Sequence, residues 1–287
     1  MTPQILLCPA KINLYLAIRG KRPDGYHELG TLFQSLDFGD TLRAEPWDSI
    51  ELLGAGGIPG KPGDNLILKA AELLRLRYPG RIPAHAGIRF SLEKRIPFGA
   101  GLGGGSSDAA GALKLGNQLW KLGLTAMELH GLACELGSDI PFFLGEETAF
   151  GEGRGEVLSS APHPFPFHVV VATPKCHVET AWAYRNAGPR MSDDGWEAFK
   201  SQFCMKAGEP EFYAQLHNDF ETPILSHFPE IRDTRETLLS FEPEKALLTG
   251  SGASLFALFR REDVARACLE SVAPQCRFSI LTHFAQS

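Results

Sequence analysis

Five glycines and two serines fall within the nine residues from Gly99 to Ser107. Glycine tolerates positive φ angles and lets backbone N–H groups come close to a ligand. A helix that starts at Ser106–Asp108 would direct its unpaired N–H groups and the positive end of its dipole into the same space. The stretch therefore predicts an anion site, and phosphate is the expected ligand.

Other glycine-rich motifs fit this stretch less well. No Gly-Lys-Ser/Thr follows the glycines, which excludes a Walker A loop. The spacing Gly99-x-Gly101-x-x-Gly104 matches the dinucleotide fingerprint, but the acid expected about 20 residues further on would be Glu128, inside a helical pattern. A flexible linker is disfavoured because the strand-like run 86–92 and an amphipathic helix flank the glycines.

Phosphoryl transfer needs a cation near the transferred group and an acceptor for the proton of the nucleophile. Lys11 is the candidate cation, because it stands beside Pro9 where the first strand is expected to break; a surface lysine on an edge strand explains it equally well. Asp139 is the candidate proton acceptor, since it follows a helix stop. It could instead be the N-cap of a helix that begins at Pro141, and the two roles can coexist. The residues alone leave both alternatives open.

Two further groups of residues could contact a ligand. The stretch from Thr249 to Ser254 alternates glycine with hydroxyl residues and could approach a ligand or the first glycine loop, although a tight hairpin turn is the simpler explanation. Tyr26, His27 and Phe33 could stack on a flat heterocycle, but aromatic residues in strands more often belong to the core.

Composition narrows the class of protein. The 287 residues are 44% hydrophobic and 22% charged, as in ordinary globular proteins, and the net charge of −6 argues against a nucleic-acid surface. The six cysteines form no C-x-x-C pair, which favours free thiols in a reducing compartment over disulfides or a zinc site. No leader-like or membrane-spanning run is present. We therefore expect a cytoplasmic protein without a nucleic-acid or membrane partner.

Periodicity predicts α+β organisation, with strands and helices in both halves. The predicted strands are 5–8, 12–18, 31–36, 40–44, 86–92, 168–172, 246–248, 255–259 and 278–281. The predicted helices are 65–76, 109–120, 125–136, 196–206, 231–239 and 264–271. The stretch Ser159–Pro166 contains three prolines and is the best candidate for a domain boundary. We therefore predict two domains, at residues 1–160 and 161–287.

Three segments together resemble the GHMP family of small-molecule kinases. They are Pro9–Leu14, Pro97–Ser107 and Leu248–Ala253, and they occur in the order that is typical of the family. The resemblance implies a two-lobed fold, with an N-terminal lobe like ribosomal protein S5 domain 2 and a ferredoxin-like C-terminal lobe. It also implies an active site in the cleft between the lobes.

The resemblance further implies ATP-dependent phosphorylation of an alcohol. The segments Asp24–Leu29, Thr31–Gln34 and Leu136–Pro141 are similar to those of members that act on the 2-hydroxyl of a cytidine-diphosphate-linked methylerythritol, in a route to isoprenoid precursors. By this resemblance Asp139 would take the hydroxyl proton, and Lys11 would keep Asp139 ionised and neutralise developing charge.

The same resemblance implies a set of binding residues. The ATP phosphates would be held by Pro97, Phe98, Gly99, Ala100, Gly101, Leu102, Gly103, Gly104, Gly105, Ser106 and Ser107. The substrate would contact Asn13, Tyr26, His27, Phe33 and Tyr184. Mg²⁺ would arrive with ATP and be held mainly by ATP and water, with Ser106 and Ser107 as candidate contacts, and no protein metal ligand is predicted.

Two alternatives to this function remain open. Another GHMP kinase, acting on a mevalonate-type or homoserine-type alcohol, would share all three motifs. A non-catalytic nucleotide-binding relative would share the glycine loop but would not need both Lys11 and Asp139.

Overall fold

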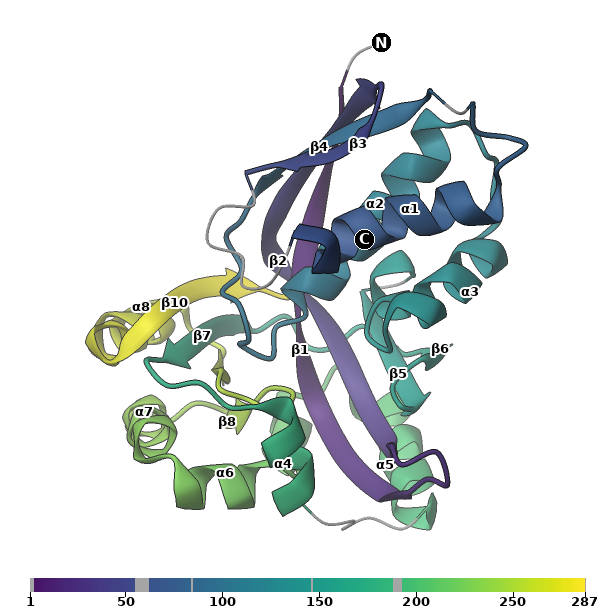
Figure 1. Cartoon of the computed structure of the whole chain (residues 1–287). Coiled ribbons are helices and arrows are strands. Elements are labelled where there is room, and N and C mark those ends of the chain that lie inside the picture. The colour runs from purple at the N-terminus through teal and green to yellow at the C-terminus, as the bar shows by residue number, and fades with distance from the viewer. Residues whose placement is uncertain (1–2, 55–61, 84, 146, 188–192, 287) are drawn as a thin grey trace. The chain divides into compact units, whose positions relative to one another are not determined.

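The computed structural model describes residues 3–54, 62–83, 85–145, 147–187 and 193–286. The chain divides into two compact units, and the long strands β1 (Gln4–Lys21) and β2 (His27–Trp47) contribute to both (Figure 1). Unit 1 comprises Met1–Ala10, Gly39–Phe98 and Gly103–Glu146, and unit 2 comprises Lys11–Phe38, Gly99–Leu102 and Glu147–Ser287. In the described part of the chain, no helix has the length and apolar character needed to cross a membrane.

The first sheet is mixed. Its remaining strands are β3 (Ile50–Leu53), β4 (Gly87–Glu93), β5 (Thr148–Gly153) and β6 (Val157–Ser160). Their order is β3-β4-β2-β5-β6, and β1 also pairs with β2. The β3–β4 pair is parallel, whereas β2–β4, β2–β5 and β5–β6 are antiparallel. This mixture is typical of α+β proteins and confirms the predicted class.

Two predicted strand interruptions are wrong. β1 continues through Pro9 and Lys11, and among the described strands it pairs only with β2, so a proline without an N–H group can be accommodated there. β2 likewise continues through Gly39. A Cβ on Gly39 would lie 2.3 Å from the carbonyl oxygen of Cys8, so this glycine allows a close backbone approach and does not end the strand.

Unit 1 places three helices beside its part of the sheet. They are α1 (Leu66–Arg77), α2 (Gly104–Leu119) and α3 (Ala126–Leu136), and α1 packs against α2 (Figure 1). The small residues of α2 permit close packing, since a Cβ on Gly111 would lie 2.6 Å from Cys8 Sγ. Thr125 and Glu128 form a capping box at the start of α3, so Glu128 is not an acid at a strand end.

Unit 2 contains a second, antiparallel sheet of β7 (His168–Pro174), β8 (Lys245–Leu248), β9 (Leu255–Phe259) and β10 (Cys276–His283), in the order β10-β7-β9-β8. Helices α7 (Pro229–Leu239) and α8 (Glu262–Val272) pack on this sheet. The core between them includes Val170, Ile231, Leu255, Ala257 and Cys268. The strands and helices predicted for this part of the chain are confirmed.

Several short elements carry no periodicity and were not predicted. They are β5, β6, α4 (Thr180–Asn186), α6 (Glu221–His227) and the 3-10 helices Pro62–Asp64, Pro210–Gln215 and Ala273–Gln275. The 3-10 helix Pro141–Leu144 begins where the alternative interpretation of Asp139 placed a helix. Helix α5 (Asp193–Lys206) was predicted from residue 196. The proline-rich stretch lies in irregular backbone at 161–167, with unit 2 on both sides of it. The domain division at residue 160 stays a prediction.

Candidate functional site

The glycine loop alternates between backbone conformations. Gly99, Gly101 and Gly103 have φ angles of 58°, 77° and 72°, in the left-handed region that glycine favours. Helix α2 begins at Gly104 with Gly103 as its N-cap, so the predicted start at Ser106–Asp108 was two to four residues too late. The backbone N–H groups in the first turn of a helix have no partner within the helix. In α2 these free donors include the N–H groups of the glycines at its start. This arrangement suits an anion.

A buried ion cluster in unit 1 joins the segment that enters the loop to the helix that leaves it. Lys94 Nζ donates to Asp40 Oδ2 and, at 2.7 Å, to Asp108 Oδ2 in α2. Asp40 Oδ1 accepts from the N–H groups of Arg95 and Ile96, at 2.6 and 2.8 Å. Burial raises the pKa of Asp108 to about 7, with Lys94 opposing and Asp40 adding to the shift. The cluster therefore fixes both ends of the loop within unit 1.

The first turn of α2 also holds polar atoms that are not satisfied. Ser107 Oγ and Asp108 Oδ1 are buried and have no hydrogen-bond partner among the described residues. Buried polar groups without partners are costly and usually find one in water or a ligand. A bound group at this helix start would supply such partners.

Replacing Lys94 by methionine is expected to lower the free energy of unfolding by about 3–5 kcal/mol, because two buried carboxylates lose their cation. The loss should be larger at pH 8 than at pH 5. Burial raises the pKa of Asp108 in the folded protein, and removing Lys94 takes away the charge that opposes this shift, so stability falls as the pH rises. Urea unfolding at both pH values measures this. Lys69→Met, which removes an exposed lysine 3.5 Å from Asp64, should cost less than about 1 kcal/mol. Equal losses in the two variants would contradict the prediction.

Lys11 and Asn13 belong to a buried polar network in unit 2. Lys11 Nζ donates to Asn13 Oδ1 at 2.7 Å and lies 5.4 Å from the ring centroid of Phe33. Asn13 Nδ2 donates to Thr31 Oγ1 at 2.8 Å, and the N–H of Asn13 donates to Thr249 Oγ1 at 3.0 Å. Lys11 is 4% exposed and Asn13 2%. Lysines are rarely buried unless they are paired. Because Lys11 is buried, the surface-lysine alternative is wrong.

The second glycine loop contacts the first one. The segment Thr249–Ser254 joins β8 to β9, so the hairpin interpretation is correct for its connectivity. In addition, a Cβ on Gly101 would lie 2.5 Å from the carbonyl oxygen of Thr249, and the N–H of Ser254 donates to the carbonyl of Ala100 at 3.3 Å. The N–H of Lys11 donates to the carbonyl of Leu102 at 3.0 Å. Unit 2 thus brings together parts of all three motifs.

Asn218 supports this arrangement and was missed in the sequence. It is fully buried, and its Nδ2 donates to the carbonyls of Leu248 and Gly250 at 2.8 and 2.9 Å. Its Oδ1 accepts from the N–H of Phe220. No sequence motif surrounds Asn218. It could not be recognised from the sequence because its role depends on contacts with a segment 30 residues away. Thr31 and Thr249 were named only as parts of the segments Thr31–Gln34 and Thr249–Ser254, and not as residues of this network.

The aromatic candidates differ in exposure: Tyr26 is exposed, His27 and Tyr184 are partly buried, and Phe33 is buried. His27 stacks on Tyr184 in α4, with ring centroids 5.0 Å apart and an angle of 21° between the planes. Burial, followed by the charge of Lys21, lowers the pKa of His27 and favours the neutral ring near pH 7. Tyr26 is 56% exposed, whereas Phe33 is 2% exposed and faces Lys11. The structure therefore joins two predicted substrate residues that are far apart in the sequence.

Asp139 lies in unit 1, in a turn that follows the end of α3. The N–H of Gly137 donates to Ala133, which confirms the predicted helix stop. The following 3-10 helix, Pro141–Leu144, has Ile140 as its N-cap without a side-chain cap bond. The N-cap interpretation of Asp139 is therefore wrong. The carboxylate is half-buried at the start of an apolar segment that includes Phe142 and Phe143.

Comparison with known proteins gives consistent matches. The family model of the GHMP kinases N-terminal domain matches residues 65–146, and that of the GHMP kinases C-terminal domain matches residues 206–276. A protein of Pelodictyon phaeoclathratiforme named 4-diphosphocytidyl-2-C-methyl-D-erythritol kinase is 38% identical over 94% of this chain and 93% of its own length.

Solved structures agree at the level of the fold. A crystal structure of 4-(cytidine 5'-diphospho)-2C-methyl-D-erythritol kinase matches with a TM-score of 0.81 and 34% identity, over 99% of this chain and 100% of the other. Homoserine kinase from Cytophaga hutchinsonii matches with a TM-score of 0.75 but only 17% identity, over 99% and 95% of the two chains. The second match carries information about the fold alone.

Proposed function

The chain belongs to the GHMP kinase family, and from this membership we propose that it phosphorylates the 2-hydroxyl of 4-diphosphocytidyl-2-C-methyl-D-erythritol with ATP. The product would enter the synthesis of isoprenoid precursors. The names of the relatives at 37–41% identity support this substrate over a mevalonate-type or homoserine-type alcohol. The proposed reaction is transfer of one phosphoryl group to an alcohol.

The observation that carries the proposal is the meeting of three motifs in unit 2. The buried ammonium of Lys11, the loop residues 99–102 and the segment 249–254 are joined by backbone and side-chain contacts. A phosphoryl-transfer site needs a cation and closely placed backbone donors, because catalysis depends on positioning and charge stabilisation. A dinucleotide-binding site needs neither this lysine nor the second glycine loop.

The roles at the reacting end follow from residue chemistry. Asp139 takes the proton of the 2-hydroxyl as the oxygen attacks the γ-phosphorus. Lys11 neutralises part of the negative charge that develops on the transferred group. The backbone donors of the loop from Pro97 to Ser107 hold the ATP phosphates and exclude water from them.

The other end of the substrate is a flat cytosine ring. Tyr26, His27 and Tyr184 offer aromatic surfaces to it, and neutral His27 can accept or donate one hydrogen bond to a neutral base. Asn13 would contact the methylerythritol part from its place beside Lys11. Phe33 would form the wall behind Lys11.

Mg²⁺ is proposed to enter as the MgATP complex, in which phosphate oxygens provide ligands that this hard cation prefers. Ser106 and Ser107, at the start of α2, are the nearest hydroxyl candidates in the loop to complete its coordination. We also propose a cytoplasmic location, because all six cysteines are free thiols and two of them, Cys8 and Cys268, are buried.

A substrate panel tests the proposed function. The protein is incubated with MgATP and, separately, the cytidylated methylerythritol, mevalonate or homoserine, and ADP release and the phosphorylated product are measured. We expect turnover of the cytidylated alcohol at least about 100-fold above the other two, since a site built to pair a base discriminates strongly against alcohols that lack it. Turnover of mevalonate or homoserine instead would assign the chain to another branch of the family.

A further inference from the structure

The turn between β1 and β2 carries Tyr26 and His27 and is held by its own polar groups. We call residues 22–27 the recognition turn. The N–H of Arg22 donates to the carbonyl of Tyr26 at 2.8 Å, and the N–H of Gly25 donates to the carbonyl of Arg22 at 3.1 Å. Asp24 Oδ1 accepts from the N–H of Tyr26 at 3.1 Å, and Asp24 Oδ2 accepts from Arg22 Nε at 3.2 Å. The backbone around Tyr26 is therefore well defined.

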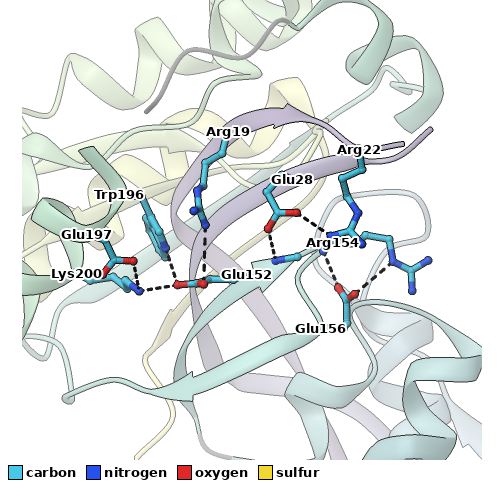
Figure 2. A network of polar contacts seen from close by, with 10 residues as sticks. Arg19, Arg22, Glu28, Glu152, Arg154, Glu156, Trp196, Glu197 and Lys200 are labelled. Carbon is cyan, nitrogen blue, oxygen red and sulfur yellow. Dashed lines mark hydrogen bonds and ion pairs between the residues drawn. The ribbon is translucent and has the colours of Figure 1, made fainter. Parts of the chain in front are cut away.

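Glu28 ties the recognition turn to the end of β5. Its Oε2 accepts from Arg22 Nη1 at 2.7 Å, and its Oε1 accepts from the N–H of Gly153 at 3.0 Å (Figure 2). One carboxylate thus contacts both a side chain of the turn and the backbone of another strand. Because both side chains are about one-third exposed, the ion pair alone is weak, and the link depends on the two-sided geometry.

Arg154 directly follows β5 and contacts the recognition turn. Its guanidinium carbon lies 4.9 Å from the ring centroid of Tyr26, within the range of a cation–π contact. The N–H of Arg154 donates to Glu156 Oε2 at 2.6 Å, and its Nε lies 3.5 Å from Glu156 Oε1 (Figure 2). Contacts therefore run in a closed ring from Tyr26 through Arg22, Glu28 and Gly153 to Arg154 and back to Tyr26.

A second group of contacts holds the base of this ring. Glu152 precedes Gly153 and accepts from Lys200 Nζ at 2.6 Å and from Trp196 Nε1 at 2.9 Å, both in α5 (Figure 2). The hydrogen bond from Lys200 lowers the pKa of Glu152, against the effect of burial. Glu152 therefore stays ionised at neutral pH and keeps the end of β5 attached to α5.

We propose that Arg154 and Glu28 form a clamp that positions the Tyr26 ring for stacking on the cytosine of the substrate, so that they set affinity for the cytidine end without contacting it. The inference rests on the proposed function. The guanidinium covers part of the Tyr26 ring, and the 56% exposure of Tyr26 leaves ring surface for a base. Arg154 is a positioning residue, because it acts through Tyr26.

The charges around the clamp favour positioning over attraction of the diphosphate. Arg154 is already matched by Glu156, and Arg22 is matched by Asp24 and Glu28. These five side chains sum to −1 when all are ionised, from two arginines and three carboxylates. Such a group gives a diphosphate little net attraction, so the guanidinium should act on the aromatic ring beside it.

Nucleotide binding and kinetics test the clamp with Arg154→Met, Arg154→Lys and Glu28→Gln. We expect Arg154→Met to raise the Kd for CMP and for CDP by the same factor, about five- to tenfold, as a lost cation–π contact near a partly covered ring implies. The KM for the cytidylated alcohol should rise by a similar factor, with kcat and the KM for ATP within about twofold. Arg154→Lys should restore part of the affinity, and Glu28→Gln should weaken binding less. Arg261→Met, an exposed arginine paired with Asp263, is the matched control.

Each other result would overturn the inference in an identifiable way. Unchanged Kd values for CMP and CDP in Arg154→Met show that the clamp has no role. A loss for CDP but not for CMP shows a direct phosphate contact. A lower melting temperature, with a higher KM for ATP, shows a purely structural role. If the unaltered protein neither binds cytidine nucleotides nor phosphorylates the cytidylated alcohol, the proposed function fails, and the clamp fails with it.

Discussion

Replacing Asp139 by asparagine is expected to lower kcat about 1,000-fold while the Kd for ATP changes less than about threefold. Asparagine keeps the size of the side chain but cannot accept the hydroxyl proton, and loss of a positioned base typically costs 10²–10⁴ in rate. Asp139 is half-buried and does not serve as an N-cap, so the substitution removes no helix cap. Initial rates with the cytidylated alcohol, together with calorimetric titration of a non-hydrolysable ATP analogue, measure both quantities.

The control for this variant is Asp64→Asn, which changes an exposed aspartate in a 3-10 helix of the same unit. It should retain full activity and stability. If Asp139→Asn keeps more than about a tenth of the wild-type kcat, Asp139 is not the base, and the proton must leave by another route.

Replacing Lys11 by methionine should lower kcat/KM about 100- to 1,000-fold, the loss typical when one group that stabilises transition-state charge is removed. Methionine has nearly the length of the lysine stem, so the packing around Phe33 is largely kept. Asn13 Oδ1 loses the donor at 2.7 Å, but it still accepts from Thr249 Oγ1 at 3.4 Å. The fold should therefore survive, which thermal unfolding can check.

Two further variants separate charge from shape at this position. Lys11→Arg keeps the charge, but its planar group is larger and cannot take the place of a compact ammonium, so little activity should return. Lys206→Met removes an exposed lysine at the end of α5 and should leave the rate unchanged. Near-normal activity of Lys11→Met in a folded protein would remove Lys11 from the mechanism.

The fold was predictable where the hydrophobic periodicity is strong. It was predicted wrongly where a glycine or a proline lies inside a continuous strand. The strands of the antiparallel sheet and the helices α7 and α8 follow the predicted ranges closely. Gly39 and Pro9 were interpreted as interruptions, because the sequence does not reveal that Gly39 faces the carbonyl of Cys8. The strand β5 was missed because it contains two glycines, and β6 because its four residues, Val157–Ser160, are too short to show an alternating pattern.

The candidate site was predictable where a motif carries the chemistry. Gly99 to Ser107 and Lys11 could be singled out from residue types and spacing alone. The two interpretations of Asp139, as proton acceptor and as N-cap, both remained open until the structure assigned the N-cap to Ile140. Supporting residues such as Asn218 and Arg154 were not recognisable, because their roles depend on partners 30 or more residues away that only folding brings near.

The interleaving of the two units limits how specificity in this family can be exchanged. The recognition turn and Arg154 belong to the same unit, yet the chain between them passes through most of the other unit. A chimera joined at any single point between residues 28 and 153 would therefore combine the recognition turn and Glu28 of one parent with the Arg154 of another. Substrate preference should then be inherited through coordinated changes at both places, and not by recombination of whole halves of the gene.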